Sequence, residues 1–222
     1  MGLKVIITGA SGMVGEGVLM ECLEHPHVES VLVIGRRPCG IEHPRLKEIL
    51  HQDFSDFSAI REELKGYDAA YLNMGVSSLG LDEEKFTHLT YDLTMALAKP
   101  LAELNPDMTL TYVSGAGTDS SEKGRSMWAR VKGRTENHLL AMPFKQAFMF
   151  RPGGIIASKG QNNIKTVYKI LAPILPIFNT LMPKMVSTAK DIGLAMINAT
   201  LYGYDKQVIE VVDIKQLAKS NT

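Results

Sequence analysis

The hydrophobic pattern of the chain alternates between short apolar runs and longer segments with helical periodicity. The apolar runs are rich in β-branched residues, which predicts buried strands. They cover residues 3–8, 30–35, 46–53, 68–73, 108–114 and 146–151. The segments between them predict helices, at residues 12–24, 57–64 and 82–104, with a fourth that contains Trp128 and Lys132 and ends near Ala141. Pro100 predicts a bend in the third helix.

Strands that alternate with helices predict a parallel sheet with right-handed crossovers. We therefore expect an α/β fold with a doubly wound parallel sheet, in a single domain over residues 1–222. Ligands of such sheets bind at the carboxyl ends of the strands. Residues directly after each predicted strand are therefore the first candidates for a functional site.

The chain after the sixth predicted strand has a different pattern. Residues 163–185 are apolar, with three prolines that interrupt any continuous helix. Thr188 and Asp191 have the spacing of a capping box, which predicts a helix that ends near Leu201. Residues 207–212 predict a last strand, with a short helix after it.

Composition and charge exclude several classes of protein. The 222 residues include 24 basic and 24 acidic ones, so no net charge attracts nucleic acid or an anionic membrane. Two cysteines without metal-ligand spacing predict neither a disulfide framework nor a metal site. No apolar run reaches the roughly 18 to 20 residues of a membrane span, and the first residues do not have the pattern of a signal peptide. A cytoplasmic protein is therefore expected.

A glycine-rich turn follows the first predicted strand and opens the first helix. Gly9, Gly12 and Gly15 have the three-residue spacing of a dinucleotide-binding loop, in which glycines allow a tight turn, backbone contact with a pyrophosphate and close helix packing. The helix N-terminus would supply free N–H groups and partial positive charge to the phosphates. We expect the neighbouring residues of the loop to contact the cofactor as well, namely Thr8, Ser11, Met13 and Val14.

The end of the second strand indicates which dinucleotide binds. A site for NAD usually carries Asp or Glu there, which accepts from the ribose 2′-hydroxyl. This chain has Arg36 and Arg37 instead. A guanidinium would pair with a 2′-phosphate, so the sequence favours NADP over NAD. The alternative is that one or both arginines only face solvent.

Residues after the third and fourth strands are further candidates for the cofactor site. Asp53 and Phe54 end the third strand, where the adenine ring is expected, although Asp53 could equally cap the following segment. Asn73, Met74 and Gly75 follow the fourth strand, where a glycine lets the backbone lie close to a cofactor.

Four motifs together resemble the short-chain dehydrogenase/reductase superfamily over about residues 1–160, and this resemblance implies a Rossmann fold. They are TGASGMVG at 8–15, NMG at 73–75, VSGAG at 113–117 and RPGGII at 151–156. The last motif implies that Pro152 and Gly153 lie at the cofactor. The short length, IGRRP and STAKDIGLAM most resemble the atypical reductases of the Tat-interacting-protein type. In the superfamily the chain after the sixth strand, here 158–222, covers the substrate.

The resemblance also implies a catalytic serine, tyrosine and lysine, of which this chain lacks the tyrosine. Ser114 falls at the position of the serine that orients the substrate oxygen, and Lys132 at that of the lysine that binds the nicotinamide ribose. The position of the catalytic tyrosine holds Trp128. An indole N–H can donate a hydrogen bond and polarise a carbonyl group, but it does not titrate and cannot deliver a proton.

Three explanations of this exchange remain open on the sequence. Ser114, Lys132 or a bound water supplies the proton, or the loop 115–127 brings another residue such as Tyr112 or Tyr91 into the site. In the third explanation the protein binds its cofactor without turnover.

The sequence therefore predicts an NADP(H)-binding oxidoreductase for a small, mostly apolar carbonyl or alcohol substrate. The alternative is a cofactor-binding regulatory or interaction protein without redox turnover. The apolar residues 163–185 have four interpretations, which are a cover over the substrate, a membrane-surface contact, a homo-oligomer interface, and plain core.

Overall fold

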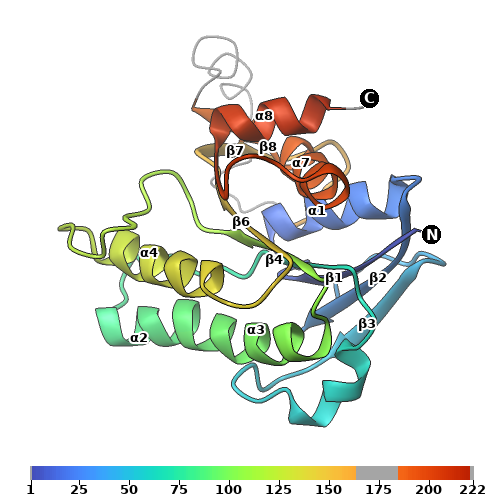
Figure 1. Ribbon diagram of the computed structural model, residues 1–222, viewed down its shortest axis with the longest axis horizontal. Helices are drawn as coiled ribbons and strands as arrows, with labels where there is room; N and C mark the ends of the chain where they lie inside the picture. Colours follow the sequence, from blue (N-terminus) through green and yellow to red (C-terminus); the bar gives the residue numbers. More distant parts are fainter. Residues whose placement is uncertain (1, 164–184, 221–222) are drawn as a thin grey trace.

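The computed structural model describes residues 2–163 and 185–220, which form one sheet with helices on both faces (Figure 1). The sheet has seven strands in the order β3-β2-β1-β4-β5-β6-β9, and all of its neighbours pair in parallel. The strands are β1 (Leu3–Thr8), β2 (Val28–Gly35), β3 (Leu46–Leu50), β4 (Ala69–Leu72), β5 (Thr109–Val113), β6 (Gln146–Arg151) and β9 (Val208–Glu210). The predicted doubly wound parallel sheet is confirmed.

Two layers of helices cover the sheet, as Figure 1 shows. One layer consists of α1 (Met13–Glu24), α7 (Ala189–Tyr202) and α8 (Val211–Lys219). The other consists of the 3-10 helix η1 (Ser58–Leu64), α2 (Glu83–Thr87), α3 (Leu93–Leu104) and α4 (Met127–Leu140). Side chains of β1 alternate between the two cores, so that Val5 and Ile7 pack under the first layer and Ile6 under the second. Burial on both faces explains why the strands are continuous apolar runs.

The observed elements differ from the predicted ones mainly at their ends. β2 begins at Val28 and β3 ends at Leu50, so β3 is shorter than the predicted strand. The long helix expected over 82–104 is interrupted by a π-helical turn, η2 (His88–Asp92), whereas Pro100 lies inside α3. Extra residues in a helical turn have no clear sequence signal, which is why this irregularity was not foreseen.

The C-terminal part adds a small second sheet and two capped helices. β7 (Gly154–Ile156) pairs in parallel with β8 (Val186–Thr188), a pairing that the sequence did not predict. The capping box of α7 is confirmed, since Thr188 accepts from the backbone of Asp191 and Asp191 accepts in return. The predicted apolar segment 163–185 lies, apart from its two end residues, outside the described residues.

Close packing joins α1 to α7 within the first layer. A Cβ on Gly17 would lie 2.5 Å from the Cβ of Ala189, and a Cβ on Gly193 would lie 3.0 Å from that of Glu21. Glycines at both positions therefore let the helices approach closely.

In the described part of the chain, no helix combines the length and apolar character needed to cross a bilayer.

Gly17→Ala should destabilise the protein because the added methyl group has no room. Overpacking costs about 1–3 kcal/mol, which exceeds the gain of about 1 kcal/mol from better helix propensity. The measurement is the free energy of unfolding in urea. Glu24→Ala is the matched control, since its side chain on α1 is exposed, and it should change the free energy by less than about 0.5 kcal/mol. Equal effects of the two variants would contradict this account of the interface.

Candidate functional site

A cleft of about 340 Å³ lies at the carboxyl ends of β1, β2 and β4, with Phe54 from the segment after β3. Its walls contain many of the residues that the sequence assigned to a cofactor. These are Gly9, Ser11, Gly12, Arg36, Arg37, Phe54, Asn73, Met74 and Gly75. The remaining lining residues are Ala10, Val33, Ile34, Gly35, Val76, Leu89 and Leu93. The fold thus brings together segments from four separate strand ends, as doubly wound sheets do.

The glycines of the loop are required by close backbone contacts. Gly9 has a φ of +74°, and a Cβ there would lie 2.5 Å from the carbonyl oxygen of Asn73. A Cβ on Gly15 would lie 2.2 Å from the carbonyl oxygen of Gly9. Gly15 therefore serves the packing of α1 against the loop, while Gly9 and Gly12 face the cleft.

The N-terminus of α1 is open toward this cleft. Gly12 is its N-cap residue, and among the described residues no side chain caps the first turn. In contrast, Asp82 and Thr188 cap α2 and α7 with their side chains. Uncapped N–H groups and the helix dipole favour an anion at this end. The residues present therefore fit the pyrophosphate of a dinucleotide.

Arg36 and Arg37 are exposed at the mouth of the cleft. Across the described residues, neither guanidinium lies within ion-pair distance of a carboxylate, and the lining includes no Asp or Glu. The side chain of Gln52 donates to the carbonyl oxygen of Arg36 at 2.8 Å, which anchors the backbone of this turn. Two cations without a competing anion fit a phosphate group.

Several residues assigned to the cofactor by sequence do not line the cleft. Asp53 accepts hydrogen bonds from the backbone and hydroxyl groups of Ser55 at 2.9 and 2.5 Å, so it stabilises a turn. This is closer to the capping alternative than to adenine binding. Thr8 is fully buried behind the loop, and Met13 and Val14 belong to α1 without reaching the cleft lining.

A second group of predicted residues lies at the end of β5, outside the cleft lining. The Lys132 ammonium group donates to the carbonyl oxygen of Ser114. Trp128, one turn earlier on α4, lies against Gly117, where a Cβ would be 3.6 Å from the indole ring. The carbonyl oxygen of Pro152 accepts from Ala116 at 2.8 Å. These contacts bring Trp128 and Lys132 of α4 against the loop that carries Ser114, residues 114–118.

Gly153 has a packing role in the structure. A Cβ there would lie 2.2 Å from the carbonyl oxygen of Met185, and Gly154 donates to the same oxygen at 2.8 Å. The glycine of the Arg-Pro-Gly motif therefore lets β7 approach the chain that leads into β8.

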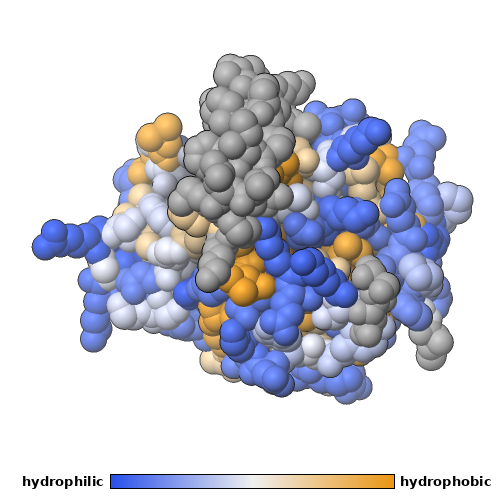
Figure 2. All heavy atoms as spheres, turned by 90° about the horizontal axis from the view of Figure 1, so that it is seen from above, coloured by the Kyte–Doolittle hydropathy of each residue, from blue (hydrophilic) through white to orange (hydrophobic). Residues whose placement is uncertain are grey.

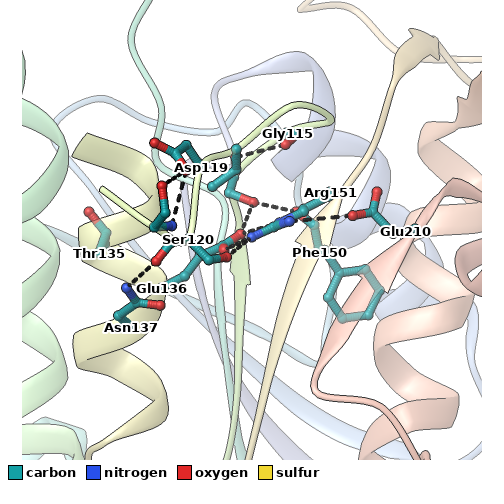
Figure 3. A network of polar contacts seen from close by, with 12 residues as sticks. Gly115, Asp119, Ser120, Thr135, Glu136, Asn137, Phe150, Arg151 and Glu210 are labelled. Atoms are coloured by element: carbon teal, nitrogen blue, oxygen red, sulfur yellow. Dashed lines mark hydrogen bonds and ion pairs between the residues drawn. The ribbon is translucent and has the colours of Figure 1, made fainter. Parts of the chain in front are cut away.

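Figure 3 shows the contacts between Glu136 and Arg151, and a buried hydroxyl group, that of Ser114, joins them. It donates to the Glu136 carboxylate, and the Arg151 guanidinium donates to both oxygens of the same carboxylate. Glu136 is fully buried and Ser114 nearly so. Arg151 also contacts Ser120 and Glu210. A buried carboxylate is tolerated here because a guanidinium and a hydroxyl group satisfy it.

Burial changes the protonation of Lys132. Loss of hydration lowers the pKa of its ammonium group to about 8, and the negative charge of Glu136 opposes part of that shift. An amine in this range exchanges a proton readily near neutral pH. Lys132 is therefore the group at this end of β5 that is suited to carry a proton.

The two tyrosines considered as alternative proton donors are placed elsewhere. Tyr112 is almost completely buried, and this burial raises the pKa of its hydroxyl group. Tyr91 contacts the imidazole of His138 at 2.5 Å, and the guanidinium of Arg134 lies 4.5 Å from the centre of its ring. The structure therefore brings neither hydroxyl group to Lys132.

Sequence reasoning missed several apolar residues of the cleft lining and one acidic residue. Leu89 and Leu93 reach the cleft from the π-helical turn and the start of α3, and Val76 from the loop after β4. A π-helical turn shifts the face that following residues present. Glu136 was not singled out, although it stands one helical turn after Lys132, on the same face.

The comparisons with known proteins place the chain in a family. A family model described as "NAD dependent epimerase/dehydratase family" matches residues 5–131. Protein HTATIP2 of Rattus norvegicus is 26% identical over 162 residues, which are 72% of this chain and 65% of that protein. The mitochondrial protein fmp52 of Emericella nidulans is 24% identical over 214 residues, with 92% of this chain and 90% of that protein covered.

Solved structures share the fold at low sequence identity. The Helicobacter pylori ADP-L-glycero-D-manno-heptose-6-epimerase has a TM-score of 0.68 and 16% identity, and covers 99% of this chain and 81% of its own. The Bordetella bronchiseptica enzyme WbmF in complex with NAD+ has a TM-score of 0.67 and 15% identity, with 98% and 76% covered.

The comparisons also correct one expectation and settle the family. The expected cytoplasmic location is wrong, because the similar FMP52 proteins of several fungi are named as mitochondrial proteins. Composition alone could not have shown this, since a neutral soluble pattern is common to both compartments. The match over more than half of the chain, together with the open glycine loop and the seven-stranded parallel sheet, shows that this protein belongs to the NAD-dependent epimerase/dehydratase family.

Proposed function

We propose that this protein is an NADP(H)-dependent oxidoreductase that acts on a small, mostly apolar carbonyl or alcohol substrate. The observation that carries the choice of cofactor is the pair Arg36 and Arg37 in a cleft without a lining carboxylate. The open N-terminus of α1 beside them supports a pyrophosphate at the same cleft. The apolar character of the substrate is supported by the sequence of residues 163–185.

In this proposal each part of the cleft holds one part of the cofactor. The N–H groups around Gly9 and Gly12 hold the pyrophosphate, and Arg36 and Arg37 hold the 2′-phosphate. Phe54 offers an aromatic surface to the adenine. When bound, the reduced nicotinamide supplies a hydride to a carbonyl carbon.

In this proposal the residues at the end of β5 supply the proton that the reduction of a carbonyl group requires. Trp128 can only donate a hydrogen bond, and the Ser114 hydroxyl proton is directed at Glu136. We assign the transferable proton to the Lys132 ammonium group, whose lowered pKa suits this role. The neutral amine that results would be reprotonated by water.

A second function is a cofactor-binding regulatory protein without turnover. Two observations favour it, namely the indole of Trp128 against the loop that carries Ser114 and the engagement of the Ser114 hydroxyl group with Glu136. In this case Lys132 would bind the ribose without transferring a proton.

The double variant Arg36→Ala/Arg37→Ala should bind NADPH at least tenfold more weakly and NADH almost unchanged. Charge-assisted hydrogen bonds contribute about 1.5–3 kcal/mol, and about 1.4 kcal/mol corresponds to tenfold in affinity. Fluorescence titration of both dinucleotides measures this. Arg61→Ala is the control, because Arg61 pairs with Glu103 away from the cleft. A wild type that prefers NADH would contradict the assignment of NADP.

Reductase activity should decrease above about pH 8, where Lys132 loses the proton that it must donate. The pH profile of kcat/KM over a panel of apolar aldehydes and ketones measures this, and Lys132→Met should have little activity at any pH. An unchanged profile in Lys132→Met would remove Lys132 from the proton transfer.

Stability measurements test the same pKa without a substrate. Between pH 8 and 10.5 the unfolded chain binds the Lys132 proton more readily than the folded one does. The free energy of unfolding of the wild type should therefore rise relative to that of Lys132→Met across this interval. A difference that stays constant with pH would show that Lys132 titrates normally.

Trp128→Tyr separates the two proposed functions. If the wild type is an oxidoreductase, both proteins reduce members of the carbonyl panel with NADPH. If only the tyrosine variant does so, the wild type is a cofactor-binding protein without turnover. Binding of NADPH should be similar in both, which the same fluorescence titration checks.

A further inference from the structure

A short strap, residues 158–163, follows β7 and lies on the first turn of α1. The side chain of Gln161 donates to the carbonyl oxygen of Met13 at 2.5 Å and accepts from the backbone of Ser158 at 2.5 Å. Gln161 is 8% exposed. Gly160 has a φ of +91°, which lets the strap turn at this point.

Glu16 is the residue of α1 that receives the strap. Its two carboxylate oxygens accept from the backbone N–H groups of Asn162 and Asn163 at 2.7 and 2.8 Å. The side chain is almost fully buried, at 1% exposure. Among the described residues no basic side chain forms an ion pair with it. The two N–H groups of the strap are thus the donors that compensate a buried carboxylate.

The strap and the cleft share the same turn of helix. Gly12 lines the cleft, Met13 directly after it accepts from the strap, and the backbone of Glu16 donates to the carbonyl oxygen of Gly12 at 2.8 Å. A change in the position of this turn therefore alters the cleft and the strap together.

We propose that Glu16 is a positioning residue, which anchors the strap to α1 and couples the position of the strap to cofactor binding in the glycine loop. The coupling rests on the proposed function, whereas the anchor does not. A dinucleotide that holds the first turn of α1 would stabilise the strap, and an anchored strap would by reciprocity strengthen dinucleotide binding.

Glutamine at position 16 distinguishes an anchor from plain packing. Its side chain has the same size and shape, but it presents one NH₂ group in place of an acceptor oxygen. A donor would then face one of the two strap N–H groups, and the negative charge would be absent. Packing is retained while the recognition of the strap is lost.

Hydrogen exchange of the backbone amides tests the anchor in the absence of cofactor. In Glu16→Gln the amides of Asn162 and Asn163 should exchange about tenfold faster than in the wild type. Glu24→Gln is the matched control on the same helix, since Glu24 is exposed, and it should leave both amides unchanged. Gln161→Met, which removes the contact with Met13, should speed the same amides. Unchanged exchange in both Glu16→Gln and Gln161→Met would overturn the anchor.

NADPH titration and exchange together test the coupling. NADPH should slow the exchange of Asn162 and Asn163 in the wild type, and Glu16→Gln should bind NADPH about tenfold more weakly. The melting temperature of the cofactor-free variant should stay close to that of the wild type. Faster exchange with unchanged NADPH affinity would overturn the coupling and leave the anchor. A wild type that binds neither dinucleotide would overturn the proposed function and the coupling, while the cofactor-free exchange would still report on the anchor.

Discussion

The close contact between the glycine loop and α1 is the constraint on which the rest of the site depends. Gly9 lies against the end of β4, and Gly15 lies against Gly9, at distances that no Cβ would allow. This packing holds the first turn of α1 over the carboxyl edge of the sheet, with its N–H groups uncapped. The cleft and the strap at Glu16 both take their positions from this turn of α1.

Two buried carboxylates organise the surroundings of this edge. Glu16 holds the strap through backbone N–H groups, and Glu136 holds Arg151 and Ser114 on the other side of the sheet. A buried charge is costly unless its hydrogen bonds are satisfied, so each carboxylate orders the groups around it. Both carboxylates tie segments that are far apart in sequence, in one case α1 to the strap and in the other α4 to β5 and β6.

Local patterns were sufficient where neighbouring residues decide the outcome. The apolar runs predicted the strands, because parallel strands are buried on both faces. The glycine spacing predicted the loop, and Thr188 with Asp191 predicted the start of α7, since a turn and a cap depend on a few adjacent residues. Patterns failed at the π-helical turn, which brings Leu89 and Leu93 to the cleft, because its extra residue has no local signal.

The sequence by itself determined the class of fold, the order of the strands along the chain, and the residues available at each strand end. Only the tertiary structure decided which of those residues meet. It directs the Ser114 hydroxyl group at Glu136. It also joins Glu16 to Asn162 and Asn163. Such contacts join distant segments, and the burial of their charged groups arises only when the segments pack, so no local pattern encodes them.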